Sequence, residues 1–191
     1  MVTNPAHAAS DPRTLAEALR AGKKVGPDAI NLLIQDHREV MTLFEAYDEE
    51  TDSAVKLALA RRICMDLRVH MAFEEELFYT ASRQVVDEEE IVDDAYDEHD
   101  EAKSLISKIE ERTSADATLT RNIRALRTAI EQHVTIEETD LFPKVRASAL
   151  DLWDLGVPMV VRRAELFAEE TVKPLPAPGR KKDPDPMSRE P

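Results

Sequence analysis

Apolar residues recur along this chain at spacings of three and four, which is the periodicity of an amphipathic α-helix. Four long segments carry the pattern, at residues 27–48, 53–84, 88–112 and 116–148. The connections between them are short, which favours antiparallel packing of neighbouring helices. The pattern predicts an all-α protein built as an antiparallel four-helix bundle.

Shorter elements flank these segments. Residues 13–23 predict a short amphipathic helix, and an additional C-terminal helix is expected at 151–171, beginning at Asp151. Pro27 is expected to open the first long helix, because its fixed backbone angle suits the first turn. Both ends of the chain are rich in proline or polar residues and are predicted to be disordered. The expected organisation is a lead at 1–26, the bundle at 27–150, the additional helix at 151–172 and a tail at 173–191.

Composition agrees with one compact helical domain. The 191 residues are 42% hydrophobic, with four glycines and an aromatic share of 5%. The net charge of −14 argues against binding to nucleic acid or to anionic membranes. Cys64 has no cysteine to pair with in the chain, no stretch is long and apolar enough to span a bilayer, and the N-terminus lacks a hydrophobic signal core. A soluble cytoplasmic protein is expected, as a monomer or a weak homodimer.

The apolar faces contain histidines where a core residue is expected. Of the five histidines, four lie in the middle of these faces, one on each long helix, and the fifth, His7, lies in the N-terminal lead. On two faces a glutamate follows four residues later, as in the pairs His70/Glu74 and His133/Glu137. Four residues along a helix rotate a side chain by only about 40° and advance it about 6 Å. Each pair can therefore reach one point together.

The same arrangement occurs twice. The stretch HMAFEEELFYT from His70 resembles HVTIEETDLFP from His133, and residues 36–39 resemble 98–101. The histidines of the first helices, His37 and His99, precede these stretches by 33 and 34 positions. The sequence therefore predicts two copies of a helical hairpin, each with one histidine on its first helix and His-x-x-x-Glu on its second.

Two buried carboxylates facing each other predict a metal ion between them. An unpaired buried carboxylate costs several kcal/mol, and no lysine or arginine lies on the stripes near these glutamates. A single histidine on an apolar face is usually an ordinary core residue, and a glutamate at a helix edge usually reaches water. Metal ligation is favoured here because the same set of histidines and glutamate occurs in both hairpins. Imidazole and carboxylate without thiolate suit iron, manganese or zinc.

Six protein ligands are too many for one tetrahedral zinc. If both glutamates bridge, two metals share them and each takes two histidines, leaving room for an oxo or hydroxo bridge and a small ligand. Two iron ions are expected, with zinc or manganese less suited. Glu75 and Glu138 are expected on the outer face or as hydrogen-bond partners of the histidines. The same outer role is open to Asp36, Glu39, Asp97 and Glu98. Tyr96, one turn before His99, is a residue that could point toward the metals.

The order of these residues, His, His-x-x-x-Glu, His, His-x-x-x-Glu over about residues 28–148, resembles the hemerythrin HHE cation-binding family. The ferritin-like di-iron motif, Glu-x-x-His, has the opposite order. The resemblance implies an up-down-up-down bundle whose metal ligands are His37, His70, Glu74, His99, His133 and Glu137.

The chain departs from the oxygen-carrying animal hemerythrins, which have a fifth histidine four residues from another on the third helix. Here Ala95 and Lys103 occupy the positions around His99, so one iron is expected to lack a protein ligand. The resemblance implies a protein that binds oxygen, hydrogen peroxide or nitric oxide, sensing or detoxifying it. A peroxide-decomposing or nitric-oxide-reducing enzyme, and iron storage or structural metal binding, stay open. A catalyst would need proton donors near the open site, such as Tyr96 or Lys103.

Overall fold

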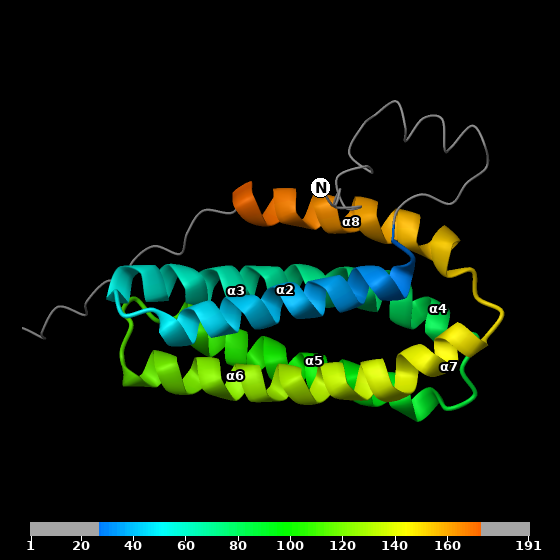
Figure 1. Ribbon diagram of the computed structural model, residues 1–191, viewed down its shortest axis with the longest axis horizontal. Helices are drawn as coiled ribbons and strands as arrows, with labels where there is room; N and C mark the ends of the chain where they lie inside the picture. Colours follow the sequence, from blue (N-terminus) through cyan, green and yellow to red (C-terminus); the bar gives the residue numbers. More distant parts are fainter. Residues whose placement is uncertain (1–26, 173–191) are drawn as a thin grey trace, which may run out of the picture.

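The computed structural model describes residues 27–172, and in that range it is helical without strands. Its four long helices form the antiparallel bundle of Figure 1, with α2 packed on α3, α3 on α5, α5 on α6 and α6 on α2. The predicted all-α bundle with an extra C-terminal helix is confirmed. The predicted helix at 13–23 and the predicted disorder of both ends lie outside the described residues. The helices are α2 (Ala29–Glu49), α3 (Ser53–Phe73), α5 (Glu89–Glu110), α6 (Ala117–Ile136) and α8 (Leu152–Val172).

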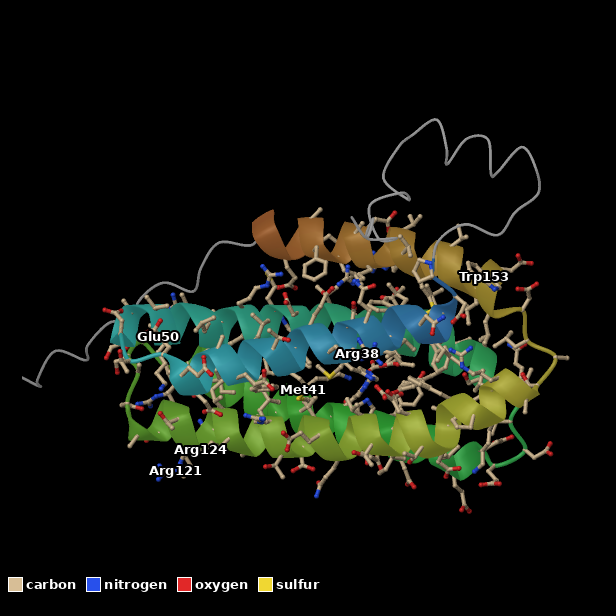
Figure 2. The ribbon with its side chains drawn as sticks, in the orientation of Figure 1. Arg38, Met41, Glu50, Arg121, Arg124 and Trp153 are labelled. Atoms are coloured by element: carbon tan, nitrogen blue, oxygen red, sulfur yellow. The ribbon has the colours of Figure 1, made fainter. Side chains whose placement is uncertain are left out.

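Aspartates begin most of these helices. The side chains of Asp28, Asp52 and Asp116 accept hydrogen bonds from backbone N–H groups in the first turns of α2, α3 and α6. Asp151 does the same for α8, through Trp153 and Asp154. The expectation that Pro27 opens the first helix is wrong, because Asp28 caps that helix and Pro27 precedes the cap. The turn after α2 is closed by Glu50, labelled in Figure 2, whose Oε1 accepts from the N–H groups of residues 51 and 52.

Two of the long helices change their winding partway along. After α3 the chain forms a π-helical turn, η2 (Glu74–Tyr79), and the short helix α4 (Thr80–Ser82). After α6 it forms a second, η3 (Glu137–Leu141), and then α7 (Phe142–Ala147). A π turn bonds i to i+5, so it contains one residue more than an α-helical turn. Side chains beyond each turn are therefore rotated relative to the α-helical pattern, which predicted both segments as uninterrupted α-helices.

The apolar core has two parts, separated by a polar layer. One cluster includes Phe73, Phe78 and Phe142, and the other includes Phe44 and Ile106. The four bundle histidines are buried in this layer, between the two clusters. Close packing on both sides keeps water away from this layer and restricts the rotamers of its side chains.

Helix α8 packs along the face formed by α2 and α3, on the side away from α5 and α6 (Figure 1). Its inner side buries Met159 and partly buries Leu166 and Phe167. At Gly156 the helix meets the backbone at the start of α2 so closely that an added Cβ would lie 2.7 Å from the carbonyl oxygen of Pro27. In residues 27–172, no helix is long and apolar enough to cross a membrane.

The close contact at Gly156 predicts that Gly156→Ala destabilises the protein. Alanine usually stabilises a helix over glycine by about 0.5–1 kcal/mol, but here the methyl group would strike backbone atoms that cannot move aside. We expect a net loss of about 1–3 kcal/mol in the free energy of unfolding, measured by urea titration. The control is Val160→Ala on the exposed side of α8, expected to change stability by less than about 0.5 kcal/mol. An unchanged or more stable Gly156→Ala protein would show that α8 is not held in this position.

Candidate metal centre

All six side chains singled out by the sequence converge inside the bundle. His37 and His99 come from the middle of α2 and α5, and His70 and His133 from the last turns of α3 and α6. The two glutamates are the first residues of the π-helical turns, so each follows its histidine by one turn. None of the six is more than 6% exposed. The residues thus form a buried polar group with little exposure to bulk solvent.

The two carboxylates lie between the histidines of the two hairpins. Glu74 Oε2 lies 3.1 Å from His70 Nε2 and 3.6 Å from His99 Nε2. On the other side, Glu137 Oε2 lies 3.3 Å from His37 Nε2 and 3.4 Å from His133 Nε2. Each glutamate therefore faces one histidine from each hairpin, which is the placement that a shared carboxylate needs.

The donor atoms fall into two groups, each compact enough to surround one cation. One group comprises His37, His70 and Glu74, and the other comprises Glu74, His99 and His133, with all ligand atoms of a group within 4.8 Å of one another. Glu137, which faces both groups through His37 and His133, lies outside these two sets. Because the ligand atoms form two groups, the arrangement fits two cations better than one.

Several atoms at the centre have no hydrogen-bond partner. These include Nε2 of His37 and His70, both carboxylate oxygens of Glu74, and Oε2 of Glu137. Leaving buried polar atoms unsatisfied costs about 1–3 kcal/mol each, and more for charged groups. Since all of them are nitrogen or oxygen donors directed at the same space, cations of the class that binds imidazole and carboxylate would satisfy them together. The residues present fit such a centre.

Acidic side chains hold the outer nitrogens of the histidines. The Nδ1 atoms of His99, His133 and His37 lie 2.8, 2.8 and 2.9 Å from carboxylate oxygens, which belong to Glu75, Glu98 and Glu138. The fourth, His70 Nδ1, lies 3.7 Å from Asp36 Oδ2, which is beyond hydrogen-bond distance. Because a carboxylate only accepts hydrogen bonds, the three short contacts place a proton on Nδ1 and leave Nε2 facing the centre. The neighbouring acids therefore orient the rings.

Without a metal ion, burial and neighbouring charges shift the pKa values of these buried groups in different directions. Burial lowers the pKa of His70, but the carboxylates of Glu74 and Asp36 outweigh it and raise that pKa to about 10. At His99, burial wins over Glu75 and lowers the pKa. Burial would raise the pKa of Glu137, yet His133 and His37 hold it well below its usual value. Cations that bind here must displace the histidine protons, because only neutral imidazole ligates a metal.

Tyr79 is a member of the centre that the sequence pattern missed. Its hydroxyl group donates to Glu137 Oε1 at 2.8 Å and lies 3.3 Å from His99 Nε2. Burial, followed by the nearby Glu137 and Glu74 carboxylates, raises its pKa well above the usual value. Tyr79 is five residues beyond Glu74, and the π-helical turn η2 brings position i+5 back to the same side. The internal repeat aligns it with Phe142, whose ring stacks on His37 at 5.9 Å.

Other residues considered from the sequence lie outside the centre. The expectation that Tyr96 could point at the metals is wrong, because its hydroxyl group donates to the backbone oxygen of Glu75 and its ring packs against Tyr79. Lys103 pairs with Glu75 and Asp100 on the surface of α5. Cys64 is buried in the second apolar cluster, and burial raises its pKa to about 12. Neither its position nor its pKa suits a ligand or a nucleophile.

A small cavity reaches the centre from one side. Its volume is about 20 Å³, enough for a molecule the size of water. Its walls include all four histidines and, at the outer end, Asp36 of α2 with Arg163 and Phe167 of α8. Only a ligand of a few atoms would fit beside the histidines.

Known proteins resemble this chain. A solved hemerythrin HHE cation binding domain-containing protein from Mycobacterium kansasii superimposes with a TM-score of 0.66 and is 21% identical, covering 76% of this chain and 91% of that one. A DNA nickase from Nostoc sp. (strain PCC 7120 / SAG 25.82 / UTEX 2576) is 28% identical over 116 residues, or 61% of this chain. Those residues make up 33% of the nickase, so this chain spans about a third of that relative's length.

The sequence model of the hemerythrin HHE cation binding domain matches residues 28–145. This match begins at the aspartate that caps α2 and ends in α7, so it includes both hairpins and all six of the converging side chains. The order of motifs, the antiparallel bundle and the matched region agree, and the chain belongs to the hemerythrin HHE cation-binding family.

Proposed function

We propose that this chain holds two iron ions and uses them to bind and detoxify a small oxidant, with hydrogen peroxide the best-supported ligand. His37 and His70 would hold one ion, and His99 and His133 the other. Glu74 and Glu137 would be shared between them. The support for this assignment is the pairing of inward-facing Nε2 atoms around two buried carboxylates that lack hydrogen-bond partners.

Iron suits this donor set better than the alternatives. The ligands are imidazole and carboxylate without thiolate, and the number of donors per ion leaves positions for a small molecule. When bound, the iron pair would supply electrons and an open binding position. The cavity favours a molecule such as oxygen, peroxide or nitric oxide over anything larger, and it has no room for the mineral of an iron store.

The single observation that favours chemistry over simple carriage is the hydroxyl group of Tyr79. A reversible carrier is expected to surround its ligand with apolar groups, as Phe142 does beside His37. Tyr79, in contrast, places a polar O–H group between Glu137 and His99. Tyr79 can therefore hold a proton for a ligand at the centre, which peroxide decomposition needs.

Tyr79→Phe is the variant that tests this role. We expect it to retain both irons and to lose peroxide turnover by about 100-fold, the lower range for general acid–base catalysis. The assay mixes iron-loaded protein with hydrogen peroxide and follows oxygen release together with the visible spectrum. The matched control is Tyr96→Phe, which removes a hydroxyl group bonded to backbone outside the centre and is expected to be within about twofold of wild type.

Two results would contradict the proposal. A wild-type protein that forms a stable and reversible absorption band in air, without consuming peroxide, is an oxygen carrier. A phenolate-to-iron band that disappears in Tyr79→Phe would make Tyr79 a ligand rather than a proton donor. The cytoplasmic location, the monomer or weak homodimer and the absence of a nucleic-acid partner stay predictions.

A further inference from the structure

Helix α8 contributes a charged side chain to the polar layer of the bundle. Arg163 Nε donates to Asp36 Oδ2 at 2.8 Å, and its Nη2 lies 2.7 Å from Asp36 Oδ1. This two-point contact holds the Asp36 carboxylate in one orientation. The guanidinium also contacts Glu39 at 3.1 Å and lies over the ring of Phe167. Arg163 is therefore fixed from several sides.

Asp36 is the acid nearest to the outer nitrogen of His70, and it is the most distant of the four acids that face a histidine in this way. The other three histidines have a carboxylate oxygen 2.8–2.9 Å from Nδ1, whereas Asp36 Oδ2 lies 3.7 Å from His70 Nδ1. The carboxylate of Asp36 is divided between a guanidinium and an imidazole. Its negative charge is thereby partly neutralised by Arg163.

We propose that Arg163 is a positioning residue for the metal centre: acting through Asp36, it orients His70 and sets how strongly His70 binds its ion. This inference rests on the proposed function, since it assigns His70 as a ligand. It makes α8 part of the site and predicts that the two halves of the centre differ. The ion held by His37 and His70 depends on α8, and the ion held by His99 and His133 does not.

The physical reason is the position of Asp36 at the rim of the cavity. Glu39 and Asp66 line the same cavity. Without the guanidinium, the two-point contact that holds Asp36 in one orientation is lost. The charge contact between Asp36 and His70 Nδ1 would then vary, and the ring orientation of His70 would be less restricted. Loss of such an outer partner typically lowers metal affinity by about 10–100-fold.

The test uses the 191-residue chain loaded with Fe²⁺ and measures release of each ion into a chromogenic chelator. For Arg163→Gln we expect one of the two ions to leave at least about 10-fold faster, with the other within about twofold of wild type. Arg162→Gln is the matched control. Arg162 also joins α8 to the bundle, through Glu76 at 2.7 and 3.2 Å, and the two arginine side chains are 28% and 27% exposed. Both ions of this control should leave at the wild-type rate.

A second variant keeps the test decisive if Arg163→Gln folds poorly. Asp36→Asn keeps the shape of the side chain and should accelerate release of the same single ion. Because the effect of Arg163 passes through Asp36, the double variant should release that ion no faster than Asp36→Asn alone. Additive effects, equal acceleration of both ions, or equal behaviour of Arg163→Gln and Arg162→Gln would overturn the inference. A wild-type protein that binds fewer than two ions would instead contradict the proposed function.

Discussion

Replacing Glu74 by glutamine is expected to reduce the iron content of the protein from two ions per chain to at most one. Glu74 Oε2 faces His70 and His99 in the two different halves of the centre, so both ions would lose an anionic donor at once. The carboxylate is fully buried, and in such surroundings a charge–charge attraction is screened far less than in water. We expect any remaining ion to bind at least about 100-fold more weakly, measured by metal analysis after dialysis.

The same variant is also expected to weaken the metal-free fold. Without a metal, the Glu74 carboxylate is the charge partner of His70, whose pKa it raises, and removing one partner of a buried ion pair leaves the other charge uncompensated. The metal-free Glu74→Gln protein should therefore melt below the wild-type temperature at neutral pH. The control is Glu76→Gln, two residues along the same π-helical turn, where the side chain is 46% exposed and pairs with Arg162. Two tightly held irons in Glu74→Gln would remove this residue from the centre.

Stripping the metal from the wild-type protein is expected to cause a large loss of thermal stability. Each ion present at a thousand times its dissociation constant adds about 4 kcal/mol to folding. A chain of this size gains roughly 2–4 °C in Tm per kcal/mol. Two ions should therefore raise Tm by on the order of 15–30 °C, and acidification should reduce the difference because protons compete for the histidines.

Differential scanning calorimetry with and without a chelator measures this shift. Glu74→Gln serves as the comparison, since its Tm should depend much less on the chelator. If wild-type protein melts at the same temperature in both conditions, the ions do not bind the native centre tightly enough to function there.

The bundle and the six converging side chains could be predicted because both follow from one short-range regularity. On an α-helix, residues three and four apart share a face, so the sequence alone places His70 with Glu74 and His133 with Glu137. Because the hairpin occurs twice, the sequence also predicts that the histidine-bearing faces of the two copies pack against each other. Glu75 and Glu138, whose roles the sequence left open, are placed by the structure on the outer nitrogens of His99 and His37.

The parts that could not be predicted depend on departures from that regularity or on distant contacts. Tyr79 reaches the centre because η2 inserts an extra residue into the turn, and the α-helical pattern assigns it to another face. The internal repeat offered a weak signal, since it aligns Tyr79 with Phe142. Arg163 meets Asp36 across 127 positions of sequence. Its role depends on how α8 packs against α2, and the local pattern carries no information about that packing.

The proposed function requires two ions that lie between two pairs of histidines and share buried carboxylates. A crystal structure of iron-loaded protein, with anomalous data collected at the iron absorption edge, would locate these ions. We expect two iron peaks roughly 3.5–4 Å apart, one beside His37 and His70, the other beside His99 and His133, with Glu74 and Glu137 near both. A single peak, peaks on the surface, or no peak in a fully loaded crystal would contradict this proposal.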